Sequence, residues 1–136
     1  MKQARKLVLL FMAVCILLSL YGSVMNYIEN GNDFERDPKV VYEIYDDLPI
    51  PDKTQEIEKK ESIRERSSVS LDVYYHTNLS NEQIRQFYIR NLPDKGWIQI
   101  EDQGGDGIAF KKGKWKIAVH DDKDKYRVDI YKIYRY

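Results

Sequence analysis

The side chains best suited to metal or acid–base chemistry are two histidines and a few acidic runs. The run His120–Asp124 alternates aspartates as calcium ligands do, but the glycine and distal glutamate of a calcium loop do not follow. Asp102 and Asp106 flank two glycines and lack the same features. A zinc site would need both His76 and His120 together with carboxylates, and nothing in their spacing brings them together. We therefore expect no metal and no cofactor, and interpret His120–Asp124 as a solvated hairpin turn.

No nucleophile motif accompanies these residues. The sequence lacks a G-x-S-x-G elbow, a P-loop and a G-x-G-x-x-G fingerprint, and its single cysteine, Cys15, lies inside an apolar run. The glycines of Gly104–Gly107 fall between predicted strands rather than before a helix, so they do not form a phosphate-binding loop. Two separated carboxylates are the minimal equipment of a glycosidase, but this chain is too short for a deep cleft. We expect a protein that is not an enzyme.

Tyrosine is the unusual component, with 11 copies in 136 residues. Tyrosine buries a large area with few rotatable bonds and therefore suits binding surfaces, but it also favours strands. Both interpretations stay open. The candidate partner-binding residues are Tyr74, His76, Tyr131 and Tyr134.

The N-terminal segment indicates where the protein resides. Residues 7–25 carry no charge and, at the helical rise, would span about 28 Å, close to one hydrocarbon core. A cleaved signal peptide is the alternative to a retained anchor, but the small residues required before a cleavage site are poorly placed. Lys2, Arg5 and Lys6 precede the segment and acidic residues follow it, so the positive-inside rule places the N-terminus in the cytoplasm. We expect a single-pass protein of the cell membrane whose C-terminal domain is extracytoplasmic.

The expected organisation has four parts: a basic N-terminus at 1–6, a transmembrane signal anchor at 7–28, a juxtamembrane tether at 29–46 and an extracytoplasmic domain at 47–136. The chain holds 22 basic and 22 acidic residues. Because three of the basic residues lie before the anchor, the remainder is weakly acidic and offers no footprint for nucleic acid. The exported part has no cysteine, so a core rather than disulfides must stabilise it.

One helix is predicted clearly, over residues 79–92. Ser80 and Gln83 have the spacing of a capping box, and Pro93 disfavours helical geometry at the preceding residue. The apolar side chains of this segment fall on one stripe, which predicts that it covers a sheet. They are Ile84, Phe87, Tyr88 and Leu92.

Alternating or apolar runs predict strands around that helix. Residues 68–77 alternate well, and shorter runs follow at 97–101, 108–111, 114–119 and 126–134. Residues 54–66 are ambiguous, because Glu56 and Lys60 suit a helical pair whereas Ile57 and Ile63 share a face only in a strand. We favour a charged edge strand there, since charges on an edge discourage aggregation.

Short connections between these strands imply antiparallel pairing. The predicted fold class is therefore α+β: an N-terminal transmembrane helix, then a two-layer domain with one helix packed on a mainly antiparallel sheet of about five to six strands. The other face of the sheet would carry polar and aromatic residues and be solvated or occupied by a partner.

A resemblance adds to this interpretation. One pattern in the sequence is similar to a pattern in small uncharacterised bacterial lipoproteins and membrane-anchored extracytoplasmic domains. It consists of the run Leu48–Pro51, Tyr75, Ser80 with Glu82, Phe87-Tyr88, Leu92 and Gly96-Trp97. The resemblance covers roughly the last 90 residues. It implies an envelope address and a helix-on-sheet fold, and no activity. No cysteine follows the apolar run, which departs from the lipoprotein version and favours a transmembrane anchor.

Three function classes follow. The first is a non-enzymatic protein-interaction or assembly module of the bacterial envelope, with another envelope protein as partner. The alternative is a domain that binds a small ligand or a cell-wall fragment on an aromatic face of the sheet. An enzyme would require His76 or His120 to meet carboxylates in a pocket.

Overall fold

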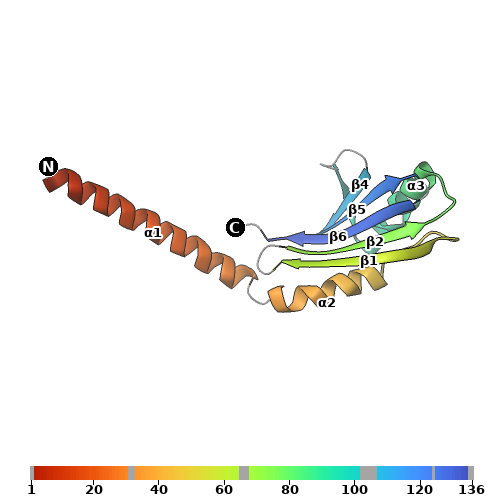
Figure 1. The fold of residues 1–136 in the computed structure, drawn as a ribbon, viewed down its shortest axis with the longest axis horizontal. Coiled ribbons are helices and arrows are strands. Elements are labelled where there is room, and N and C mark those ends of the chain that lie inside the picture. The colour runs from red at the N-terminus through yellow and green to blue at the C-terminus, as the bar shows by residue number, and fades with distance from the viewer. Residues whose placement is uncertain (1, 31–32, 65–67, 102–106, 124, 135–136) are drawn as a thin grey trace.

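The computed structural model describes residues 2–30, 33–64, 68–101, 107–123 and 125–134. The described residues form an α+β protein with three α-helices and a six-stranded antiparallel sheet (Figure 1). In chain order the elements are α1 (Lys2–Asn30), α2 (Asp33–Asp46), β1 (Gln55–Arg64), β2 (Ser68–His76), α3 (Asn81–Asn91), the 3₁₀ turn η1 (Pro93–Lys95), β3 (Ile98–Ile100), β4 (Gly107–Lys112), β5 (Trp115–Asp122) and β6 (Lys125–Ile133).

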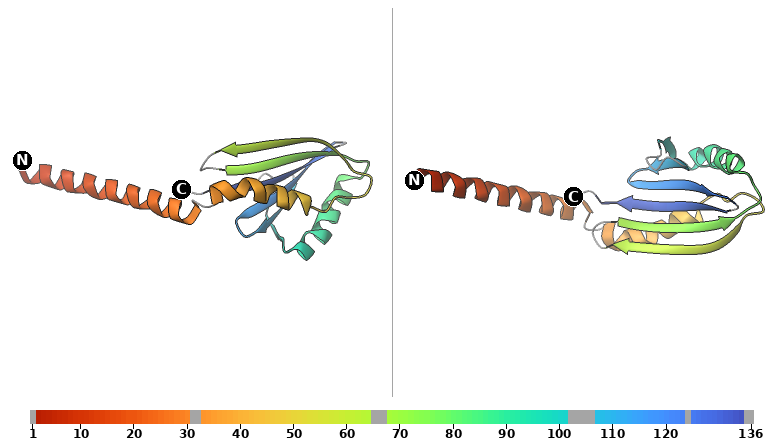
Figure 2. Two further views of the ribbon diagram at one scale, coloured as in Figure 1. Left: turned by 90° about the horizontal axis from the view of Figure 1, so that it is seen from below. Right: turned by 45° about the horizontal axis from the view of Figure 1, so that its top comes forward.

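Helix α1 extends away from the sheet in each view (Figures 1 and 2). Its apolar side chains are exposed, with Leu10 at 64% and Phe11 at 70%. Within the described residues, none of the helices has both the length and the apolar character required of a membrane span.

Helix α2 occupies most of the segment expected to be a tether. Asp37 and Val41 in α2 are fully buried, and Leu48 just after it is also in the core. Because Asp37, Val41 and Ile44 recur at helical spacing, they fall on one face of α2, which packs against β2 and β6. The folded domain therefore begins within α2, well before residue 47.

The order of the sheet is β1-β2-β6-β5-β4-β3. The strands from β3 to β6 form the expected meander, and β6 then pairs with β2, which lies far earlier in the sequence. Residues 102–106, expected as the β3–β4 turn, lie outside the described residues.

The ambiguous segment forms β1, an edge strand as expected. The strand has a bulge at Ile57, because Glu56 pairs with Tyr75 and Glu58 pairs with Tyr74. The bulge reverses which side chains of the strand face α2. Glu56 therefore faces α2, in the position that Ile57 would occupy in a regular strand. Ile57 and Ile63 remain 55% and 45% exposed.

The capping box of α3 is confirmed. The Ser80 hydroxyl accepts from the Gln83 amide at 3.2 Å, and the Gln83 side chain accepts from the Ser80 amide at 2.9 Å. Ile84, Tyr88 and Leu92 are buried against the sheet. Gly96, whose φ is 84°, then turns the chain toward β3 with the left-handed geometry that glycine tolerates.

Two helices, rather than the single helix predicted, cover the sheet. Alternate residues of β6 contact both: Tyr126 meets Tyr88 of α3, and Lys132 meets Asp37 of α2. Both helices therefore lie on one face of the sheet (Figure 2). We call the opposite face, which none of the described helices covers, the open face.

Candidate functional site

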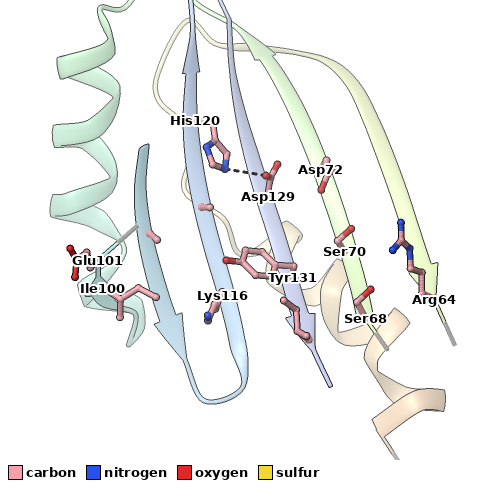
Figure 3. Close-up of a pocket in the computed structure, with 13 residues that line it drawn as sticks. Arg64, Ser68, Ser70, Asp72, Ile100, Glu101, Lys116, His120, Asp129 and Tyr131 are labelled. Atoms are coloured by element: carbon pink, nitrogen blue, oxygen red, sulfur yellow. Dashed lines mark ion pairs between the residues drawn. The ribbon is translucent and has the colours of Figure 1, made fainter. Parts of the chain in front are cut away.

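The open face carries a hollow of about 620 Å³ (Figure 3). Its floor includes Ala109 of β4 and Ala118 of β5, whose short side chains are buried. Ile100 of β3 lines one side of the hollow, and Asp72 of β2 lines the other. The two alanines lie side by side in neighbouring strands, between larger side chains. They therefore leave a depression in the surface of the sheet.

Asp129 of β6 is the centre of the charge cluster in this hollow. His120 Nε2 lies 3.2 Å from Asp129 Oδ2, and Arg127 Nε lies 2.6 Å from Asp129 Oδ1. The side chain of Asp129 is only 16% exposed. Within the described structure, neither Asp129 Oδ1 nor Arg127 Nε makes a well-directed hydrogen bond. Their contact is therefore an ion pair in which both atoms keep unused hydrogen-bonding capacity.

Asp72 is directly opposite Asp129 in the β2–β6 register. Partial burial, and next the negative charge of Asp129, raise the pKa of Asp72, although Arg127 and Lys60 act in the other direction. Among the described residues, none makes a hydrogen bond or close ion pair with the Asp72 carboxylate. The cluster thus contains one neutralised aspartate and one aspartate without a partner.

Tyr74 and Tyr131 also lie on the open face, and cations approach their rings. Lys60 Nζ is 4.9 Å from the centre of the Tyr74 ring, and Lys116 Nζ is 6.0 Å from that of Tyr131. His76 is exposed at the end of β2, where it pairs in register with Lys125.

Tyr134, the fourth residue predicted to bind a partner, does not lie on this face. It is 4% exposed and its hydroxyl donates to Asp37, next to the buried ion pair in which Lys132 Nζ is 2.6 Å from the same carboxylate. Tyr134 therefore helps to dock α2 on the sheet. Tyr136 lies outside the described residues.

The arrangement is suited to recognising charge. His120 meets the Asp129 carboxylate in this hollow, which is the condition that an enzyme would require, whereas His76 does not. The two resemble the base and orienting acid of a catalytic triad, but within the described structure no hydroxyl or thiol makes a hydrogen bond with His120. Among the described residues, no three histidine, cysteine, aspartate or glutamate side chains lie together as a metal site would require. Asp124, a residue of the acidic run considered above, lies outside those residues.

A second hollow, of about 270 Å³, lies on the helix side between α2 and the β4–β5 hairpin. Trp97 and Trp115 line it. The Lys95 ammonium donates to Asp47 at 2.7 Å, and the Lys95 carbonyl accepts from the Lys112 ammonium at 2.8 Å. The polar groups around this hollow therefore largely satisfy one another. This pattern indicates a structural junction.

Sequence reasoning did not single out Asp72, Arg127 and Asp129. Their alternation placed them on the polar face of their strands, but only the non-local pairing of β2 with β6 brings them together. No protein-family model matches this chain, and neither the curated proteins nor the solved structures contain a significant match.

Proposed function

We propose that this chain is a membrane-anchored, non-enzymatic module of the bacterial envelope that binds another envelope protein through the open face of its sheet. The observation that carries the proposal is the unpartnered Asp72 carboxylate opposite Asp129 in a preformed hollow. Like charges directly opposite each other destabilise a sheet. Folding alone gives no reason to keep such a pair, and strained or costly features concentrate where a protein binds or reacts.

The composition of the open face also supports protein recognition. Interfaces are enriched in tyrosine and arginine, and Tyr74, Arg127 and Tyr131 all lie around the cluster. Each is half-buried, so a partner would remove little more side-chain freedom on binding.

The membrane anchor is proposed from residues 7–25, which no charge interrupts, and from the exposed apolar side chains along α1. The three basic residues before it support a cytoplasmic N-terminus and an extracytoplasmic domain. A cysteine introduced at the exposed position Glu82, in a Cys15→Ser background, tests this arrangement. A membrane-impermeant maleimide should label it in intact cells; labelling only after lysis would contradict the proposed orientation.

Site-specific crosslinking tests the binding function. Full-length protein with a photo-reactive phenylalanine analogue at Tyr131, on the open face, should give one discrete adduct with a membrane or envelope protein in native membranes. The matched control places the analogue at Arg90, which is exposed on α3 on the other side of the sheet. Equal adducts from both positions, or none from Tyr131, would contradict the proposal.

The alternative is a small ligand or cell-wall fragment in the hollow. Its volume of about 620 Å³ lies within the usual range for small-molecule pockets, roughly 300–1,000 Å³. Binding of soluble wall fragments to the purified full-length protein, together with no adduct from Tyr131, would favour this second function.

A further inference from the structure

Three charged side chains that line the open hollow, Asp72, Glu101 and Lys116, make no ion pair within the described residues. Asp72 makes no hydrogen bond or close ion pair with the described residues. Lys116 of β5 likewise has no ion pair in the described structure, and its ammonium lies near the face of Tyr131. A bound molecule could therefore neutralise each group without breaking an existing pair.

The sheet sets the separation between Asp72 and Lys116. Asp72 pairs with Asp129, and Ala118 pairs with Asp129 on the other side, so Asp72 and Ala118 are two strands apart. Lys116 lies two residues farther along β5. With strands about 4.8 Å apart and about 3.4 Å per residue, the two α-carbons are roughly 12 Å apart.

Asp72 is the stronger determinant of the two. Its carboxylate is partly buried beside a second carboxylate, and burial raises its pKa, so Arg127 and Lys60 compensate the ionised form only in part in the unbound protein. Because Asp129 lies directly opposite Asp72, an ammonium or guanidinium paired with Asp72 would be attracted by both carboxylates.

We propose that the hollow receives an extended segment of the partner protein in which a lysine or arginine pairs with Asp72, and an acidic residue four positions away pairs with Lys116. An extended chain covers about 3.3 Å per residue and directs side chains four residues apart to the same side, so this spacing of about 13 Å matches the separation across the sheet. The inference rests on the proposed function and specifies the chemistry of the partner. The hollow lies on an open face, which a segment of a larger protein can reach.

The test uses full-length protein in native membranes with the crosslinker at Tyr131. Asp72→Asn should lower the yield of the adduct at least about tenfold, Asp72→Lys should abolish it, and Lys116→Glu should also lower it. Matched controls are Asp94→Asn, on the exposed η1 turn, and Lys111→Gln, on the open face but outside the lining of the hollow; both should crosslink as the parent does. Circular dichroism of each purified variant checks that the fold is retained.

Mass spectrometry of the adduct then locates the crosslinked segment. It should contain a lysine or arginine four residues from an acid, and exchanging that basic residue for glutamate should restore the adduct with Asp72→Lys. If the adduct forms but Asp72→Asn leaves its yield unchanged, or the segment lacks a basic residue, the charge-pairing inference is wrong while the proposed function stands. If the parent forms no adduct, both fail.

Discussion

Asp72 of β2 lies directly opposite Asp129 of β6, so two carboxylates share one cross-strand position at the centre of the open face. Within the described residues, Asp129 has close basic partners, His120 and Arg127, whereas Asp72 has none. Because folding brings these carboxylates together, the folded state carries a repulsion that the unfolded chain lacks. The stability of the protein should therefore report on this pair.

We expect Asp72→Asn to raise the free energy of unfolding at pH 7 by roughly 0.2–1 kcal/mol, the scale of cross-strand pairs. The pKa of Asp72 is raised in the folded state, so folding favours its protonated form. The contribution of Asp72 to stability is then fully present below the ordinary aspartate pKa of about 4 and is lost as the pH rises through the folded-state pKa. Urea unfolding of both proteins across this pH range measures the difference.

Asp94→Asn is the control for this experiment. Asp94 is exposed on η1, outside the sheet, so no carboxylate lies opposite it on a neighbouring strand. It should change the free energy of unfolding by less than about 0.5 kcal/mol. A loss of stability in Asp72→Asn at pH 7 would show that the carboxylate has a stabilising partner.

The buried ion pair between Asp37 and Lys132 should be costly to break from one side. Lys132→Met leaves a buried, unpaired carboxylate and should lower the free energy of unfolding by about 3–5 kcal/mol. Adding Asp37→Asn removes that charge while retaining an acceptor for Tyr134, so the double variant should recover most of the loss. Denaturant unfolding of the four proteins completes a double-mutant cycle, and additive effects would contradict coupling between the two side chains.

The N-terminal cap of α3 gives a local test. Ser80→Ala removes the acceptor of the Gln83 amide and should lower the free energy of unfolding by about 1 kcal/mol. Asn81→Ala, at the exposed next position, should change it by less than about 0.5 kcal/mol. Similar values for the two variants in urea unfolding would show that the capping box contributes little.

The buried tyrosines should make the protein sensitive to alkali. Burial raises the pKa of Tyr75, Tyr88 and Tyr126, which stack or meet edge to edge between α3 and the sheet. The stability that they confer is intact below the ordinary tyrosine pKa of about 10 and is lost as the pH rises toward their folded-state values. Phenolate absorbance should therefore show a late phase that coincides with loss of far-UV circular dichroism. Complete ionisation of the tyrosines with the fold intact would contradict this.

Local patterns were sufficient to predict much of the sheet and the helix α3. The alternation in β2 and β6 and the capping box at Ser80 each depend on residues that are close in the sequence. Helix α2 was missed, although Asp37, Val41 and Ile44 have helical spacing, because charges, a proline and the Asn-Gly-Asn run before it are typical of a tether.

The candidate site could not be predicted in the same way. Asp72 and Asp129 are separated in sequence by α3 and three strands, and no local rule specifies that β2 pairs with β6. The bulge at Ile57 is similar, because it depends on the register of β1 against β2. The local periodicity predicts which residues lie outside the core, whereas the pairing of strands that are distant in sequence determines which of those residues come into contact.

The docking of α2 through Asp37 limits the reach of the domain. Only two residues separate the end of α1 from the start of α2, and two residues span at most about 7 Å. If residues 7–25 cross the membrane as proposed, the open face can explore only a shell about as deep as the domain, whose nine-residue strands measure roughly 30 Å. Its partner must then present the recognised segment close to the bilayer, and targets farther out in the envelope are beyond its range.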